Sequence, residues 1–274
     1  MKIVEFLRIP LFQRAMLGAF LAGSTLSLLG VVVVTANLTT IRFALMHLAL
    51  LGGAVALAFK LPLLAGALGG IMVASLILGP WAERFKIDPG MMSAYLMTGS
   101  LGFAFILFYR AGVPAMEVFS LFTGGLLLLN LNDLFVLLFL GVVVLFVFWA
   151  FYYEIELFLY DQEMAEALGV PIRLLQTGLI FLTGLAIGVA MRVVGALMVD
   201  AIIVIPALTA LSFARGLKEG LIFTSLFGVI ASVGGLFLSM GADLPVGASI
   251  TVSAVALLAI VNLLKNKLNF RRRS

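Results

Sequence analysis

The chain has 274 residues, of which 64% are hydrophobic and only 11% are charged. A soluble domain is closer to half apolar and a quarter charged, so this composition excludes an ordinary soluble protein and is typical of a polytopic membrane protein. There is no cysteine, which excludes disulfides and thiolate metal sites, and the net charge of +4 is expected to mark the cytoplasmic side of a membrane, with no nucleic-acid partner.

The N-terminal segment mixes apolar and charged side chains before a long apolar run. Residues 1–12 carry Lys2, Glu5 and Arg8 among apolar neighbours, which predicts a short helix lying at the membrane interface. The run Ala15–Val34 is long enough to cross a bilayer and too long for the hydrophobic region of an ordinary signal peptide. We therefore expect it to be retained as the first span.

Nine apolar stretches have the length of a membrane span, roughly 17–25 residues. The segment Val113–Asn130 is also apolar, but Gly124 and Gly125 interrupt it, and it is interpreted as partly buried or re-entrant. The pattern predicts an all-α bundle of about nine transmembrane helices in one transmembrane domain, residues 1–274, with eight helices as the alternative. The predicted spans are residues 13–34, 41–59, 62–79, 91–109, 133–153, 172–190, 194–213, 219–240 and 246–264.

Basic residues indicate which loops face the cytoplasm. The C-terminal residues 265–274, KNKLNFRRRS, are predicted to form a basic cytoplasmic tail. Alternating back through nine spans places the N-terminus outside, whereas the eight-helix alternative places both ends inside.

Two GxxxG pairs, Gly66 with Gly70 and Gly184 with Gly188, fall inside predicted spans. Small residues let helix backbones approach closely in lipid, where no hydrophobic force drives helices together. These pairs favour a compact bundle of helices.

The longest polar connection between spans, Tyr153–Arg173, is predicted to be cytoplasmic and to contain a short helix at residues 161–169. Asp161 is placed to cap the N-terminus of this helix, and Gly169 to end it in a left-handed turn before Pro171.

The predicted helix has a small apolar face, which we expect to be exposed beside two acidic residues. Such a helix can dock into a groove on a soluble partner and transmit its motion; a connecting helix without a partner is the alternative. Glu154 and Glu156, which precede the helix, are expected to be solvated. The residues assigned to docking are the apolar Ala165, Ala167 and Leu168, the acidic Glu163 and Glu166, and the two ends, Asp161 and Gly169.

Four segments, in this order, resemble motifs of the zinc/manganese-type permeases of ABC importers. LFQRAMLGAFLAGSTLSLLGVVVV resembles the first segment of that family, and LYDQEMAEALGVPIRLL resembles its coupling segment. VVGALMVDAIIVIPALTAL is similar to its VG-L-V-A-L-I-PA-TA pattern, and ADLPVGASITV to its D-LP-G-T-V turn before the last helix. Together these matches cover most of the chain.

The resemblance implies a permease subunit that works as a homodimer in a bacterial or archaeal cytoplasmic membrane. Cytoplasmic ATP-binding subunits would bind the Asp161–Gly169 helices, and an extracytoplasmic metal-binding protein would deliver a zinc or manganese ion as substrate, with iron as a further candidate. The sequence has no GxxxxGK[ST] phosphate loop, so ATP would be hydrolysed on another chain. We expect this chain to be no enzyme and to bind no cofactor.

The family usually carries Asp-x-x-x-His near the start of its second helix. This spacing places a carboxylate and an imidazole on one helix face, and such a pair suits transient Zn or Mn binding. Here the aligned segment is RFALMHLALLG. His47, the only histidine, is retained, but Phe43 replaces the Asp and Arg42 replaces the preceding Gly. His47 is thus a candidate for the metal path, alone or paired with its copy across a dimer axis; a packed histidine is the alternative.

Asp200, in the seventh predicted span, is the second candidate for the metal path. A carboxylate at that depth costs roughly 2.5–3.5 kcal/mol on insertion scales, so we expect an aqueous path or a partner such as Arg192. Counting residues from the membrane edges places Asp200 and His47 about 10 Å apart along the membrane normal. Met46, Met191 and Met198 are interpreted as ordinary packing.

Two other functions remain open from the sequence. One is an ABC permease for a metal chelate, such as a siderophore or cobalamin, which needs no metal-coordinating side chains. The other is an ion-coupled secondary transporter that uses Asp200 as its coupling carboxylate.

Overall fold

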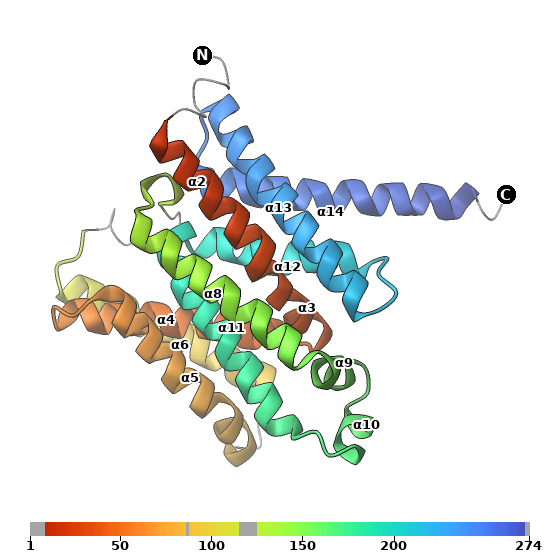
Figure 1. Cartoon of the computed structure of the whole chain (residues 1–274). Coiled ribbons are helices and arrows are strands. Elements are labelled where there is room, and N and C mark those ends of the chain that lie inside the picture. Colours follow the sequence, from red (N-terminus) through yellow and green to blue (C-terminus); the bar gives the residue numbers. More distant parts are fainter. Residues whose placement is uncertain (1–8, 86–87, 115–124, 272–274) are drawn as a thin grey trace. The chain divides into compact units, whose positions relative to one another are not determined.

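The computed structural model describes residues 9–85, 88–114 and 125–271, and within these residues all regular secondary structure is helical (Figure 1). Backbone polar groups have no water to bond in a bilayer, so a spanning segment must satisfy them within its own helix. The helices are α2 (Pro10–Leu21), α3 (Ser27–Thr35), α4 (Thr39–Ala58), α5 (Leu63–Phe85), α6 (Pro89–Arg110), α8 (Leu131–Ala150), α9 (Tyr152–Tyr160), α10 (Gln162–Ala167), α11 (Ile172–Val194), α12 (Ala196–Leu211), α13 (Leu217–Ala242) and α14 (Val246–Arg271).

Seven helices in the described part are long and apolar enough to cross a membrane. The predicted third and seventh spans correspond to shorter apolar helices, Leu63–Ile77 within α5 and Met198–Leu211 within α12. The predicted count of nine spans is therefore not confirmed, although the all-α membrane architecture is. The seven candidate spans are Pro10–Thr35, Thr39–Ala58, Gly90–Arg110, Leu131–Ala150, Ile172–Met191, Leu217–Ala242 and Val246–Lys265.

Three predicted peripheral segments fall partly outside the described residues. Of the expected interfacial helix at 1–12, residues 10–12 instead begin α2, because Pro10 is well suited to the first turn of a helix. Of the interrupted segment 113–130, the described end forms a short 3-10 turn, η2 (Leu126–Leu128). Of the basic tail 265–274, residues up to Arg271 continue α14 as helix.

The chain forms two compact units, each assembled from separated segments. The first comprises residues 1–34, 123–146 and 193–274, and the second comprises residues 35–122 and 147–192. In the first unit, α13 packs against α2, α12 and α14. In the second, α4 packs against α5 and α6 (Figure 1).

In the first unit, a π turn, η1 (Ala22–Leu26), joins α2 to α3 within one continuous span. Hydroxyl groups in and next to the turn bond to the backbone of the same span. Thr25 donates to the Leu21 carbonyl at 2.7 Å, and Ser27, the first residue after the turn, donates to the Gly23 carbonyl at 2.6 Å. Gly23 lies directly against Gly228 of α13, and a Cβ at Gly23 would be 2.5 Å from the Gly228 carbonyl oxygen. The turn therefore sits where two helix backbones touch.

In the second unit, the predicted glycine pairs do lie at helix contacts. Gly66 and Gly70 of α5 face Gly52 of α4 so closely that a Cβ at either position would collide with the α4 backbone. Gly184 and Gly188 of α11 leave room for the side chain of Ile71. Small residues thus set the helix spacing, as expected in a membrane bundle.

We predict that Gly66→Ala destabilises the protein by about 1–3 kcal/mol, because the added methyl group must push α4 and α5 apart. The measurement is the thermal unfolding midpoint of the purified chain in detergent. Gly69→Ala is the matched control on the same helix, since a Cβ there meets no atom within 4 Å. An equal loss of stability in the two variants would contradict the assigned contact.

Candidate functional site

The short helix α10 is closed at both ends by hydrogen bonds. Asp161 accepts from the Met164 N–H at 2.9 Å, which is the predicted N-cap. Gly169 has φ +83°, and its N–H donates to the Glu166 carbonyl at 3.0 Å, while the Val170 N–H donates to the Ala165 carbonyl at 2.9 Å. This pair of bonds is a Schellman motif, so both predicted ends of the helix are confirmed.

The exposed face of α10 differs from the predicted one. Ala165 is fully buried, and α10 packs against α9. Residues two apart on a helix point about 200° apart, so Ala165 cannot share a face with Ala167. The exposed apolar residues are Ala167, Leu168 and Met164, with Leu168 65% and Met164 51% exposed. The sequence analysis missed Met164, although the spacing 164, 167, 168 indicates one helix face.

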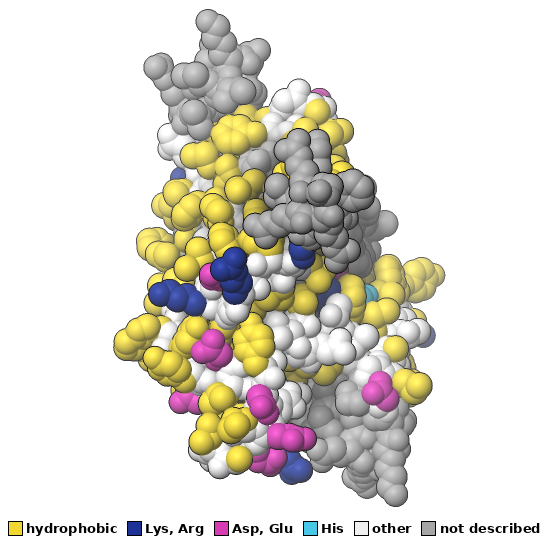
Figure 2. Space-filling model, turned by 90° about the vertical axis from the view of Figure 1, so that its right-hand side faces the viewer, with side chains coloured by type: hydrophobic (Ala, Val, Ile, Leu, Met, Phe, Trp, Pro, Cys, Tyr) yellow, Lys and Arg dark blue, Asp and Glu magenta, His cyan; other side chains and the backbone are white. Residues whose placement is uncertain are grey.

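Acidic side chains surround this apolar face. Figure 2 shows several acidic side chains in the lower half of the face that it draws. Glu163 and Glu166 on α10 are exposed, as predicted. Glu154 and Glu156 on α9 are half-buried instead of fully solvated, and the Tyr152 hydroxyl donates to Glu156 at 3.4 Å. The helix therefore offers a soluble partner a small apolar surface with an acidic rim.

His47 lies on α4 and is half-buried. Its Nδ1 lies 2.7 Å from the Phe43 carbonyl oxygen. A carbonyl only accepts hydrogen bonds, so Nδ1 carries the proton and the lone pair of Nε2 is left for an acceptor or ligand role. Metal-binding histidines are commonly oriented by such a bond from the other ring nitrogen.

The residues preceding His47 carry a positive charge in place of the expected negative one. Arg42 is buried, and its guanidinium carbon lies 4.3 Å from the centroid of the Phe43 ring, in cation–π geometry. A cation therefore adjoins the position at which the resemblance leads us to expect a carboxylate.

Asp200 lies on α12, five residues after Gly195, and is half-buried. Gly195 has φ +86° and separates α11 from α12, so Asp200 follows a break in the helical path. Asp200 belongs to the first compact unit and His47 to the second. Among the described residues there is no group of three or more His, Asp or Glu that could hold a metal ion.

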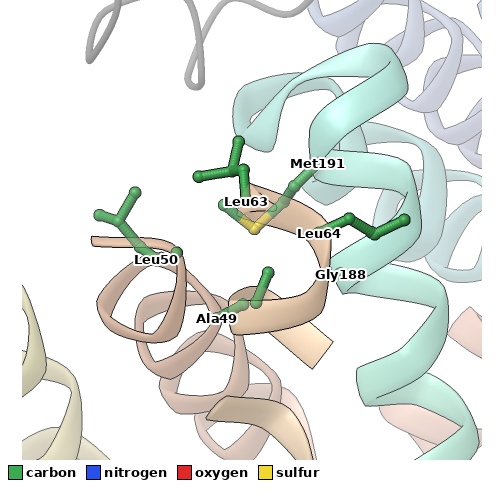
Figure 3. A pocket seen from close by; sticks show the side chains of 8 residues that line it. Ala49, Leu50, Leu63, Leu64, Gly188 and Met191 are labelled. Carbon is green, nitrogen blue, oxygen red and sulfur yellow. The ribbon is translucent and has the colours of Figure 1, made fainter. Parts of the chain in front are cut away.

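The methionines lie in apolar surroundings. Met191 extends from α11 towards Leu63 of α5 and lines a cavity of about 30 Å³ together with Ala49 and Leu50 of α4 (Figure 3). All the side chains around this cavity are apolar, so it offers a water or a metal ion no polar side-chain partner. Met46 and Met198 are likewise buried. These positions agree with the interpretation of the three residues as packing.

The whole chain is similar to membrane proteins of metal transport systems. A family model described as "ABC 3 transport family" matches residues 8–265. The high-affinity zinc uptake system membrane protein ZnuB of Haemophilus influenzae is 30% identical over 263 residues, covering 91% of this chain and 97% of that protein. The manganese transport system membrane protein MntC of Halalkalibacterium halodurans is 25% identical over 256 residues, covering 93% and 88%.

A solved structure extends the likeness to the fold. A chain of PsaBC from Streptococcus pneumoniae, in complex with Fab, superposes with a TM-score of 0.85 at 25% identity and covers 95% of both chains.

We predict that the neutral imidazole of His47 carries its single proton on Nδ1, because this nitrogen faces the Phe43 carbonyl oxygen. Because the chain has one histidine, [¹⁵N]histidine labelling gives one pair of ring signals, and their shifts identify the protonated nitrogen. A proton on Nε2 would contradict the assigned bond to Phe43. Addition of Zn²⁺ is expected to shift the Nε2 signal more than the Nδ1 signal if His47 binds the ion.

Proposed function

The chain belongs to the ABC 3 transport family, and from that premise we propose that it is the membrane permease subunit of an ATP-driven importer for a divalent transition metal. The family match over residues 8–265 carries this proposal. Zinc and manganese are the favoured cargoes because related proteins are named as zinc and manganese transport components, and iron is a further candidate. The chain is a multi-pass membrane protein, and we expect it in the cytoplasmic membrane of a bacterium or archaeon.

The proposed assembly contains two copies of this chain, two cytoplasmic ATP-binding subunits and an extracytoplasmic metal-binding protein. The absence of a phosphate loop from the sequence supports ATP hydrolysis on a separate subunit, so this chain would be a transport component and not an ATPase. The exposed Met164, Ala167 and Leu168 of α10 would enter a groove of the ATP-binding subunit, with Glu163 and Glu166 at its rim.

The geometry of α10 suits the transmission of force. Its N-cap and its Schellman motif hold both ends, so the six-residue helix can move as one body. Buried Ala165 and the contact with α9 would carry that movement to α9, which follows α8 after a single residue, while the chain beyond Gly169 leads into α11. Closure and reopening of the ATP-binding subunits would then open the translocation path first to one side of the membrane and then to the other.

His47 and Asp200 are the proposed residues of the metal path. A single imidazole is a poor site for a divalent ion, so we propose that Nε2 of His47 acts with the same atom of the second copy, and that Asp200 provides a carboxylate elsewhere on the path. We propose a topology of nine spans with the N-terminus outside, in which the short apolar helices of α5 and α12 are the third and seventh spans. The break at Gly195 supports a path beside α12, since broken helices in membranes commonly border a translocation route.

A metal chelate is the second candidate cargo, and one observation favours it. Buried Arg42 adjoins the position of the missing carboxylate, and its charge would repel a bare dication but attract an anionic complex. An ion-coupled secondary transporter, the other alternative, has less support than either ABC function, because the chain belongs to an ABC family.

We predict that the chain, reconstituted in liposomes with its ATP-binding subunit and external binding protein, shows ATPase activity stimulated by one bare ion among Zn²⁺, Mn²⁺ and Fe²⁺. Uptake of that ion should depend on ATP. If a metal chelate stimulates the ATPase and none of the free ions does, the cargo is a chelate and not a bare ion. Uptake driven by a proton gradient without ATP would overturn both.

In the same vesicles, Asp200→Asn and His47→Gln are expected to lower metal uptake at least tenfold while the ATP-binding subunit still co-purifies. Unchanged uptake in either variant would remove that residue from the path.

We predict that Gly169→Leu uncouples ATP hydrolysis from transport. A Cβ at this position meets no atom within 4 Å, so the effect comes only from the positive φ, which costs a non-glycine residue about 1–2 kcal/mol and loosens the end of α10. Gly169→Asn is the control, because Asn tolerates this conformation better. If the ATPase of the Leu variant still responds to metal as the unmodified complex does, α10 is not the coupling element.

A further inference from the structure

A second cavity, of about 330 Å³, lies in the second unit between the junction of α8 with α9 and the start of α11. It is bounded by Val147 and Phe151 at the end of α8, and by Leu174, Leu175 and further apolar residues on the first turns of α11. Its volume is at the lower end of the range of small-molecule sites. No step of the proposed transport cycle uses it.

The surroundings of the cavity place it at the depth of lipid headgroups. The 20-residue helix α8 ends at Ala150, and at about 1.5 Å per residue it is as long as the hydrocarbon core is thick. Trp149 and Tyr153, which are 78% and 75% exposed, stand at this end, where aromatic residues favour the membrane–water interface. Leu174, at the cavity wall, is 72% exposed, so the cavity can be reached from the lipid phase.

The cavity has one charged residue in its wall, Glu154. Nearby along the chain, Glu156 and the acidic residues of α10 add negative charge, while Arg173 is the only basic residue between positions 147 and 182. An anionic headgroup would be repelled at this surface, and a cationic group would be attracted. An apolar cavity with a carboxylate in its wall at headgroup depth matches an amphiphile with a cationic end.

We propose that this cavity binds a phospholipid with a primary ammonium headgroup, of the phosphatidylethanolamine type, from the leaflet on the α10 side. One acyl chain would occupy the apolar part between α8 and α11, and the ammonium group would donate hydrogen bonds to Glu154. A choline headgroup has no N–H to donate, and charge-assisted hydrogen bonds are among the stronger polar contacts. The bound lipid would lie against the helices that flank α10.

The test is photocrosslinking of the full-length chain in phosphatidylcholine nanodiscs that contain a trace of phosphatidylethanolamine with a diazirine in its acyl chain. We expect crosslinks on peptides from residues 147–182. Unlabelled phosphatidylethanolamine should compete roughly tenfold better than phosphatidylcholine or phosphatidylglycerol, from the value of one charge-assisted hydrogen bond. Equal competition by the three lipids would overturn recognition of the headgroup.

Two variants separate the two parts of the proposed site. Gly178→Leu fills the cavity, and because a Cβ there meets no atom within 4 Å, the backbone is left undisturbed; crosslinking should fall at least fivefold. Gly102→Leu on α6, another exposed helical glycine with open space around it, is the matched control and should not change the yield. Glu154→Gln should keep the crosslink but remove the preference for ethanolamine.

Three further outcomes would count against the proposal. Crosslinks that survive Gly178→Leu would identify the lipid as part of the general bilayer. A preference for ethanolamine that survives Glu154→Gln would remove the carboxylate from recognition. Loss of the crosslink on addition of the ATP-binding subunit would assign the cavity to a side chain of that partner.

Discussion

Close approach of helix backbones at glycine is the interaction on which both compact units depend. In lipid, apolar side chains gain little by leaving their surroundings for one another, so helices must be held by packing at short range. Gly52 meets Gly66 and Gly70 in the second unit, and Gly23 meets Gly228 in the first. These contacts fix the spacing of the helices that carry His47 on α4 and the π turn in the first span. The helix that carries His47 is therefore held in place by residues that have no side chain of their own.

Features that depend on a few neighbouring residues could be predicted from the sequence. The caps of α10 follow from Asp161 and Gly169, because capping is decided within one helical turn. Apolar length alone located the long helices to within a few residues. The predicted seventh span proved to be a shorter apolar helix, α12, since length measured along a sequence does not show where Gly195 turns the chain.

Features that depend on tertiary packing were predicted less well. Ala165 is buried and Met164 exposed because α9 covers one side of α10. The spacing of 164, 167 and 168 indicates that these residues share a face, but nothing within 161–169 shows which face α9 covers. Glu154 was expected in solvent but lines a cavity formed with α11. The orienting bond from His47 to the Phe43 carbonyl follows from helix geometry, whereas the position of Arg42 over the Phe43 ring depends on how α4 is packed. The replacement of the expected Asp by Phe43, by contrast, was visible from the sequence, and it remains the point at which the chain departs most clearly from the zinc/manganese pattern.

The π turn at Ala22–Leu26 also constrains how this chain can change in evolution. Such a turn accommodates one more residue than an α-helix would in the same length, so α2 and α3 keep the phase that a regular helix one residue shorter would give them. Removal of one residue from the turn would therefore convert it to regular helix and leave α2 and α3 in phase, whereas removal of one residue from the part of α2 after Phe12 would rotate everything before that point by about 100°. Phe12, now buried against Phe237, would then point elsewhere. Among descendants of this sequence, single-residue gaps in this span are therefore expected within the turn more often than within α2.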